Sequence, residues 1–273
     1  MISIIIVSYN QKKLLKQCID NIFKSDIKNN FEIIIVDNDS KDNTRKYLQS
    51  INDKRVSVIL NKDNLGYAKA NNQGIKRARG EYILLLNPDV IIYPNSVEVL
   101  AQFLKTHKNV AMVGPRLLNV DGSVQGSCCR FPKLYTPIAR RTILGRLPIL
   151  QNELDRYLMK DFDHENKREV DWMIGACLMI KKDILEKVGL LDERYFLYFE
   201  DVDLARKFWT IGKKVYYLPE SRVTHAHQRL SANKNIFSKV VRIHILSGIK
   251  YFLKWGLTKL LFFSNIKKRI IKK

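Results

Sequence analysis

The sequence has 273 residues, which is enough for one large domain, or one domain with an appendage, around a buried core. Hydrophobic residues make up 46% and charged residues 27%, the composition of a soluble globular protein rather than of a disordered chain. The formal net charge is +21, and 13 Lys and Arg but no acidic residue follow Glu220. A basic tail attracts polyanions, so nucleic acid and anionic lipid are both candidate partners.

Cysteine usage and the N-terminal residues indicate the cytoplasm. Cys18, Cys128, Cys129 and Cys177 form no CxxC pair, so we expect free thiols in a reducing compartment. The N-terminus lacks the charged region, the long apolar stretch and the cleavage site of a signal peptide. We therefore expect a protein that stays in the cytosol.

Strands and helices are predicted to alternate over the first 90 residues. Short β-branched runs predict buried strands at 3–8, 31–36, 56–60 and 82–86, and apolar residues at helical spacing predict helices at 11–25, 42–50 and 66–80. This alternation is typical of an α/β fold, with a mostly parallel sheet covered by helices.

Three of these strands end in polar residues, at Tyr9-Asn10, Asp37-Asn38 and Asn87-Pro88-Asp89. In an open α/β sheet the ligand binds beyond the carboxyl ends of the strands. We therefore expect these polar ends to gather at one edge of the sheet, although they are far apart in the sequence.

The second half of the chain is less regular. The pattern predicts a strand at 110–113, a mobile basic excursion at 130–146, an apolar run at 170–180, a helix at 182–188, a helix at 201–211 and a strand at 214–218. Apolar residues punctuated by Lys and Arg over 232–273 predict a basic amphipathic helix, with no run long enough to span a bilayer. This helix either lies on a membrane or packs on the preceding domain, and the two are compatible.

Two aspartates at strand ends are candidate ligand-binding residues. Asp89 is placed to hold a divalent cation that bridges a diphosphate, although Asn-Pro-Asp is also a common turn. Asp37 is placed to accept a hydrogen bond from a base or a ribose, whereas Asp39 or Ser40 is placed to cap the next helix.

A second acidic site follows an aromatic cluster at 195–199. Burial among these rings would raise the pKa of Glu200 or Asp201 and suit a general base, whereas acids in a first helical turn also simply favour the helix dipole. His225 and His227 are alternative candidates to complete a metal site, and a lone histidine is often structural.

The sequence resembles glycosyltransferase family 2, the inverting enzymes of the GT-A fold, and within it the bacterial rhamnosyltransferase-like members. The resembling motifs are SIIIVSYN (3–10), IIIVDNDS (33–40), NLGYAKANNQGI (64–75), YILLLNPDV (82–90), GPRLLNVDGSVQ (114–125), WMIGACLMI (172–180), LDERYFLYFEDVDLARK (191–207) and PESRVTHAHQRLS (219–231). Their order and spacing are much more specific than any one of them alone.

The resemblance implies roles for individual residues. The donor would contact Ser8, Tyr9 and Asn10 along the nucleotide, Asp37 and Ser40 at the base, Asn64, Gly66, Lys69 and Asn72 at the ribose and diphosphate, and Trp172, Gly175 and Ala176 at the sugar and acceptor pocket. Asn87 and Asp89 stand where the family has its metal-binding DxD motif. Asn87 replaces the first acid, which should weaken metal affinity when no phosphate is present.

The resemblance also implies a reaction. Asp201, with Glu200 beside it, would deprotonate an acceptor hydroxyl, and Asp89 with His225 or its rival His227 would hold Mg²⁺ or Mn²⁺. The acceptor would be a glycan or a polyprenyl-diphosphate-linked sugar, and the donor dTDP-rhamnose or, next, a UDP-hexose.

The implied organisation is a catalytic domain at 1–230 and a basic helical tail at 231–273, peripheral on the inner face of the plasma membrane. Nucleic acid is then not expected as a partner. A nucleotidyltransferase and a non-catalytic nucleotide-sugar-binding protein remain as alternatives.

Overall fold

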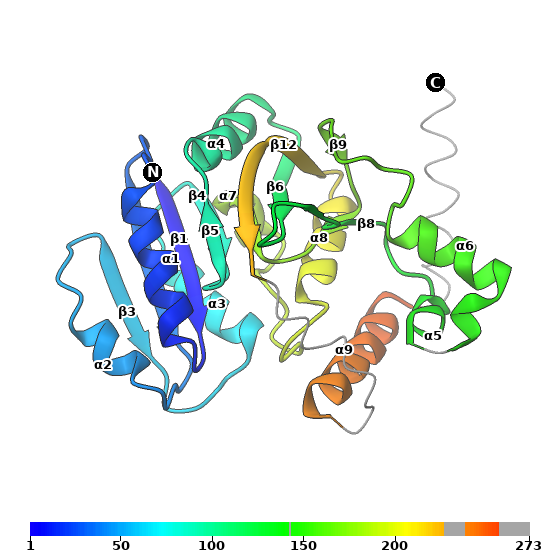
Figure 1. The fold of residues 1–273 in the computed structure, drawn as a ribbon, viewed down its shortest axis with the longest axis horizontal. Coiled ribbons are helices and arrows are strands. Elements are labelled where there is room, and N and C mark those ends of the chain that lie inside the picture. Colours follow the sequence, from blue (N-terminus) through cyan, green and yellow to red (C-terminus); the bar gives the residue numbers. More distant parts are fainter. Residues whose placement is uncertain (142, 227–237, 257–273) are drawn as a thin grey trace.

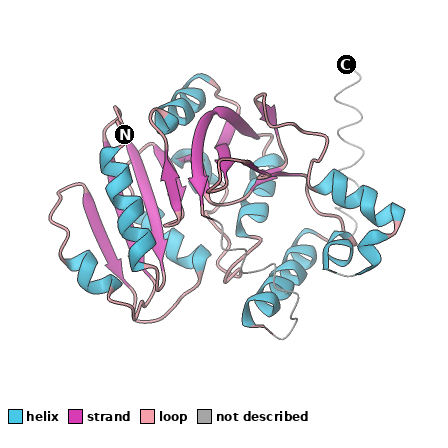
Figure 2. Ribbon diagram, in the orientation of Figure 1, coloured by secondary structure: helices cyan, strands magenta, loops and turns pink. Residues whose placement is uncertain are grey.

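The computed structural model describes residues 1–141, 143–226 and 238–256 (Figure 1). His227 and most of the predicted tail therefore lie outside the described residues. Within them, the chain forms one large mixed sheet with helices on both faces (Figure 2). The order of its strands is β3-β2-β1-β4-β11-β6-β12-β5, with two short strands attached at β6 and β12.

The first half of the sheet is parallel. It consists of β1 (Ile2–Ser8), β2 (Phe31–Asp37), β3 (Val56–Leu60) and β4 (Tyr82–Leu86). β1 pairs with β2 on one side and with β4 on the other, and Ser8 lies opposite Asp37 in the register. Because these strands run the same way, their carboxyl ends meet at one edge of the sheet, as the sequence predicts.

The second half of the sheet is mixed. It consists of β5 (Val90–Ile92), β6 (Val110–Leu118), β11 (Cys177–Lys181) and β12 (Lys214–His225), with β7 (Val124–Gln125) and β9 (Arg168–Glu169) at its margin. β11 runs antiparallel to both β4 and β6, whereas β12 runs parallel to β6. β8 (Cys128–Cys129) and β10 (Trp172–Met173) form a separate antiparallel pair.

Alternate side chains of the buried strands face two different cores. Ile4 and Ile6 pack in one core with α1 (Lys12–Lys24) and α4 (Ser96–Thr106), whereas Ile5 packs in the other with α3 (Tyr67–Arg77), α7 (Lys182–Lys187) and α8 (Glu200–Thr210). Successive strand residues point to opposite faces, and both faces are apolar here, so the sequence shows no alternation. A short helix, α2 (Thr44–Gln49), joins β2 to β3.

β12 is longer than its predicted span of 214–218. The pairing of β12 with β6 shifts register between Leu218 and Arg222, and the strand then continues to His225. The irregular pairing spans Pro219, which cannot donate a ladder hydrogen bond, and the bulge carries the strand past it. His225 consequently is the last residue of this strand, beyond its predicted span.

The segment 130–146, predicted as a mobile excursion, is largely helical in the structure. It contains α5 (Thr136–Arg141) and a 3₁₀ turn, η1 (Ile143–Arg146), and α6 (Pro148–Tyr157) follows. Pro137 and Pro148 lie in the first turns of α5 and α6, where the missing N–H has no intrahelical acceptor. Both prolines therefore lie where helices begin.

The described part of the tail, α9 (Lys239–Trp255), packs on the main body of the chain. Tyr251 is fully buried and its hydroxyl accepts a hydrogen bond from Arg206 of α8 at 2.7 Å. The Lys254 ammonium lies 2.7 Å from carboxylate oxygens of both Asp192 and Asp203. Packing on the domain is thus observed for α9, and no helix in the described ranges has the length and apolarity needed to cross a bilayer.

Gly66, at the start of α3, is a position where the fold requires glycine. Its φ is +85°, and a Cβ there would lie 2.6 Å from the carbonyl oxygen of Phe196. Gly122 has a similar φ of +83° but open space around the position of a Cβ. Substitutions at these two glycines therefore distinguish the cost of backbone strain from the cost of a steric clash.

We expect Gly66→Ala to lower the free energy of unfolding by more than about 2 kcal/mol, since strain and a backbone clash add. Gly122→Ala, the matched control, should cost only about 1 kcal/mol from the left-handed backbone. Urea unfolding followed by circular dichroism measures both. Equal losses in the two variants would contradict the contact between Gly66 and Phe196.

Candidate active site

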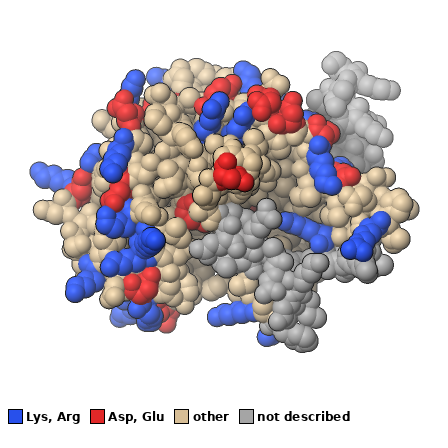
Figure 3. Space-filling model, in the orientation of Figure 1, with Lys and Arg blue, Asp and Glu red and all other residues tan. Residues whose placement is uncertain are grey.

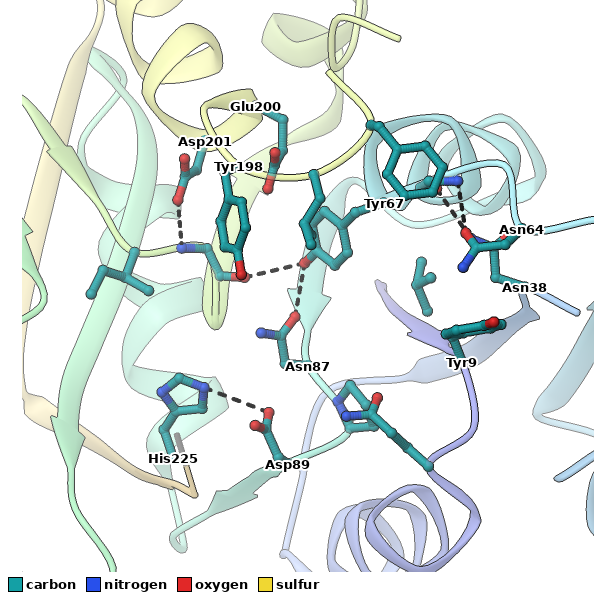
Figure 4. A pocket seen from close by; sticks show the side chains of 18 residues that line it. Tyr9, Asn38, Asn64, Tyr67, Asn87, Asp89, Tyr198, Glu200, Asp201 and His225 are labelled. Carbon is teal, nitrogen blue, oxygen red and sulfur yellow. Dashed lines mark hydrogen bonds and ion pairs between the residues drawn. The ribbon is translucent and has the colours of Figure 1, made fainter. Parts of the chain in front are cut away.

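A cavity of about 340 Å³ lies at the carboxyl ends of β1 and β4. The chain moves from β1 to β2 on one side and reaches β4 on the other, so the cavity stands at a topological switch point. Apart from Gln11, its lining residues come from all the motifs except 114–125: Val7, Tyr9, Gln11, Asn38, Asn64, Gly66, Tyr67, Asn87, Pro88, Asp89, Ile174, Gly175, Phe196, Leu197, Tyr198, Glu200, Asp201 and His225. Figure 4 shows Glu200 and Asp201 on one side of this space and Asp89 and His225 on the other.

Asparagine side chains build the wall next to β1 and β2. The Asn64 carboxamide oxygen accepts hydrogen bonds from the Gly66 N–H at 3.0 Å and from the Asn38 amide at 2.8 Å. The Asn38 oxygen accepts from the Leu65 N–H at 3.0 Å. These bonds fix the turn that begins α3, while Tyr9 stays 46% exposed with its ring available for stacking.

Asp37 is fully buried at the end of β2, next to the cavity wall. One carboxylate oxygen accepts from Arg45 Nε at 2.8 Å and from the Ser40 N–H at 3.2 Å. Among the described residues its other oxygen has no hydrogen-bond partner, nor does the hydroxyl of Ser8, which lies opposite in the register. Buried oxygens of this kind are costly without a partner, so they are suited to receive a polar ligand group.

Asp89 and His225 form a pair at the opposite side of the cavity. His225 Nε2 lies 3.5 Å from Asp89 Oδ1, and His225 is 3% exposed. Burial lowers the pKa of His225 to about 4, so the imidazole is neutral at pH 7.

Gln125 of β7 fixes the orientation of this imidazole. Gln125 donates from its amide nitrogen to Asn119 at 2.9 Å, so its oxygen faces His225 Nδ1 at 2.8 Å. His225 therefore carries its proton on Nδ1 and directs the lone pair of Nε2 towards Asp89, which is the arrangement that suits a metal ligand. A group of three His, Cys, Asp or Glu that would hold a metal alone is absent from the described residues.

Asn87 is held by Tyr67 in the middle of the cavity. The Tyr67 hydroxyl lies 2.9 Å from the Asn87 carboxamide oxygen and 3.2 Å from the carbonyl oxygen of Gly175. Burial raises the pKa of Tyr67 well above its usual range, so this hydroxyl remains a donor. Asn87 Oδ1 is consequently engaged by a tyrosine, and Asp89 alone of this motif supplies a carboxylate.

Glu200 and Asp201 begin α8 and face the cavity from the side opposite Asp89. Burial raises the pKa of Asp201 to about 6, although N–H groups of Gly175 and Val202 donate to its oxygens at 3.1 and 2.8 Å. Burial and the adjacent charge of Asp201 raise the pKa of Glu200 well above its usual range, which favours the protonated form of this carboxyl. Two adjacent carboxyl groups that bind protons more readily than exposed ones thus stand side by side.

Backbone geometry orients Glu200 and Asp201. Tyr198 and Phe199 precede α8 and both adopt left-handed conformations, with φ of 69° and 70°. Such conformations are costly for aromatic residues and persist where the surrounding packing holds them. Gly175 has no side chain between its N–H and Asp201, and a Cβ there would lie 3.4 Å from that of Asp201.

Several predicted site residues do not line the cavity. The Asn10 N–H donates to Ser40 Oγ at 2.8 Å, and Asn72 hydrogen-bonds both the N–H and the carbonyl of Leu191. Trp172 is buried, with its indole N–H bonded to the Arg130 carbonyl, and the Ala176 carbonyl accepts from the Asn87 N–H. Lys69 is exposed on α3. Their assignment to the substrate stays a prediction.

Tyr67, Gln125 and Tyr198 are functional candidates that the sequence reasoning does not identify. All three lie inside the motifs that carry the family resemblance, at 64–75, 114–125 and 191–207, so their signal is present. Their contacts span about 20 to 110 residues of sequence separation, and a single sequence gives no indication of such pairs.

Comparison with known proteins identifies the family of this chain. The sequence profile described as Glycosyl transferase family 2 matches residues 3–189. Over 270 residues the chain is 34% identical to the glycosyltransferase GlyG of Streptococcus pneumoniae, covering 91% of this chain and 82% of the relative. It is 28% identical over 224 residues to the N-acetylglucosaminyl-diphospho-decaprenol L-rhamnosyltransferase of Mycobacterium tuberculosis, covering 78% and 71%.

A solved structure shows the same fold. GalNAc-T7, determined with UDP, GalNAc and Mn²⁺, matches with a TM-score of 0.62 and 19% identity, over 82% of this chain and 43% of that one. The predicted GT-A fold is thereby confirmed, and so is the resemblance to bacterial rhamnosyltransferase-like proteins. Because the family profile covers more than half of its length, the chain is a member of glycosyltransferase family 2.

Proposed function

We propose that this chain transfers a sugar, with inversion, from a nucleotide-sugar to a hydroxyl of a lipid-linked or glycan acceptor. The observation that carries the proposal is the pairing of two unlike sites across one cavity. Asp201 and Glu200 stand on one side, and Asp89 and His225 stand on the other (Figure 4). The first pair suits a hydroxyl acceptor, and the second suits the diphosphate of a donor.

The residues at the second pair fit a divalent cation, Mg²⁺ or Mn²⁺. Asp89 offers a carboxylate and His225 a neutral imidazole whose tautomer Gln125 fixes. Two protein ligands are enough when phosphate oxygens and water complete the coordination shell. A bound cation would supply Lewis-acid stabilisation of the departing nucleoside diphosphate. The similar GalNAc-T7 structure contains Mn²⁺ with UDP.

The wall formed by β1, β2 and the start of α3 suits the nucleoside. Tyr9 presents an aromatic ring, and the buried oxygens of Ser8 and Asp37 are suited to the polar edge of a base or a ribose. We favour dTDP-rhamnose as donor because the relative from Mycobacterium tuberculosis is named for rhamnosyl transfer, and we place a UDP-hexose next.

Asp201 is the proposed general base. Its pKa of about 6 leaves it ionised at pH 7 yet basic enough to accept a proton from a hydroxyl that attacks the anomeric carbon. The hydroxyl approaches from the face opposite the leaving diphosphate, so the configuration inverts. Glu200, whose protonated form burial favours, acts beside it as a hydrogen-bonding group for the acceptor.

The acceptor class and the membrane follow from the relative and from surface composition. That relative is named for a sugar carried on diphospho-decaprenol. α9 carries four Lys and Arg and no acidic residue, and it exposes Leu246 and Leu253. Elsewhere, basic side chains are interspersed with acidic ones over the face seen in Figure 3. We infer a peripheral protein at the inner face of the plasma membrane.

Asp201→Asn should lower kcat by roughly 10² to 10⁴-fold, because the amide cannot accept the proton. Glu200→Gln, the matched control, should retain kcat within about tenfold, since burial already disfavours the charged form of Glu200. Release of nucleoside diphosphate from dTDP- or UDP-sugars measures both, and both variants should still bind donor. Near-normal turnover by the Asp201 variant would remove its role as base.

The rate of transfer should fall as the pH is lowered through about 6, because Asp201 must be ionised to accept a proton. An exposed aspartate would place this limb near pH 4. A profile of kcat against pH, recorded at saturating donor from about pH 4.5 to about pH 8, locates this limb. A profile that stays flat to its acid end would contradict the assignment.

Gln125→Leu should weaken Mn²⁺ binding about 10- to 100-fold, because the imidazole of His225 loses the partner that fixes its tautomer. Titration of Mn²⁺ followed by electron paramagnetic resonance, with dTDP or UDP present, measures the affinity. Gln102→Leu, a change on α4 remote from the cavity lining, serves as the control. Unchanged Mn²⁺ affinity in the Gln125 variant would exclude His225 as a ligand held in this way.

A further inference from the structure

A second cavity, of about 240 Å³, lies between α9 and the segment that contains α5 and α6. Leu134 and Tyr157 line one side, Ile249 and Phe252 line the other, and Phe199 and Arg140 also contribute. We name this space the α9 groove. Figure 1 shows α5, α6 and α9 grouped together, away from the parallel half of the sheet.

We propose that the α9 groove binds the lipid-proximal part of the acceptor, namely an isoprenoid chain and the diphosphate joined to it. This inference rests on the proposed function, because it supplies a second contact region for a lipid-linked acceptor. It is a distinct site, since it shares no lining residue with the cavity that holds Asp201 and Asp89.

The first support is the concentration of exposed apolar side chains around this groove. Of the 18 exposed large hydrophobic residues among the described ones, nine lie at 134–158 and 245–253. They are Leu134, Tyr135, Leu147, Ile149, Leu158, Ile245, Leu246, Ile249 and Leu253. A soluble monomer rarely gathers so much apolar surface in one region without a binding partner.

The second support is charge. The segment 126–150 and α9 together contain nine Lys and Arg and no Asp or Glu. Arg140 lines the groove, and no ion pair to it occurs within the described ranges. Its planar guanidinium matches the geometry of phosphate oxygens. An apolar groove with a guanidinium in its lining is complementary to an isoprenoid diphosphate.

The third support is continuity with the reacting centre. Phe199 lines the α9 groove, and its chain neighbours Tyr198 and Glu200 line the active-site cavity. His244 of α9 lies against both aromatic rings, at centroid distances of 4.8 Å to Tyr198 and 5.5 Å to Phe199. An acceptor bound in the α9 groove would therefore reach the reacting centre past this turn.

The lipid bilayer is the competing partner for this surface. Two residues of α9 distinguish binding in the groove from binding to the bilayer. Ile249 is 50% exposed and lines the groove, whereas Leu246 is 55% exposed on the same helix and does not. Both tolerate a charge because both face solvent in part. Leu246→Glu and Ile249→Glu therefore change the net charge equally but only one alters the groove.

The experiment uses farnesyl diphosphate as the probe, below its micelle concentration, and measures its binding to the full chain by isothermal titration calorimetry. Inorganic pyrophosphate and farnesol are titrated separately. We expect Ile249→Glu to weaken binding by about tenfold or more, because a carboxylate would meet the chain, and Leu246→Glu to change it less than about twofold. Arg140→Gln should weaken farnesyl diphosphate but not farnesol.

Three results would overturn the proposal: no binding of farnesyl diphosphate, equal weakening by both glutamate variants, or equal affinity for pyrophosphate alone. Equal weakening, together with equal loss of binding to phosphatidylglycerol vesicles, would assign the surface to the bilayer. Asp201→Asn should bind the probe as the wild type does. Sugar transfer without groove binding would refute only the groove, and groove binding without transfer would refute only the proposed function.

Discussion

The parallel pairing of β1 with both β2 and β4 is the constraint on which the site depends. It sets Ser8 opposite Asp37 and Ile5 opposite Leu85, so the three strands end at one edge. The strand that follows β1 in the sequence, β2, lies on one side of it, and β4 lies on the other side. This reversal of strand order opens the space between the ends of β1 and β4. Residues 80 positions apart in the sequence consequently line one cavity.

Burial then sets the charge of this cavity. It lowers the pKa of His225 and raises those of Glu200 and Tyr67, so it disfavours the charged form of all three groups. The carboxylates of Asp89 and Asp201 remain at opposite sides. A negative cavity of this kind disfavours a bare diphosphate, and it favours a diphosphate that arrives with a divalent cation. Metal and donor are thereby expected to bind together.

The sequence predicts the parallel half of the sheet well, because β-branched runs buried on both faces leave an unambiguous pattern. It also indicates Asp89 and Asp201 by their positions after strand and before helix. It does not predict the course of β12 beyond Leu218, where a bulge carries the strand past Pro219. Nor does it predict α5 and α6, because Pro137 and Pro148 mark helix starts here and loops elsewhere.

Long-range side-chain contacts are the other part that a single sequence does not disclose. Gln125 reaches His225 across 100 residues, and Tyr67 reaches Gly175 across 108. Asn72 shows the reverse case, because a motif position expected at the donor holds the loop at Leu191. Family motifs thus indicate which positions are important, and the contacts in the structure show the role of each residue.

α9 joins this site to the surface of the protein. Its buried side is tied to α8, the helix that begins with Glu200 and Asp201, through the contacts of Tyr251 and Lys254. Its other side exposes leucine and isoleucine beside the α9 groove. The same helix therefore supports the proposed base and borders the proposed lipid site.

The most direct measurement is a crystal structure of the protein with dTDP-rhamnose or a UDP-hexose and Mn²⁺. The account predicts the cation between Asp89 and His225, the diphosphate bound to it, and the anomeric carbon turned towards Asp201. A nucleotide bound outside the cavity at β1 and β4, or a cation held away from Asp89, would contradict it.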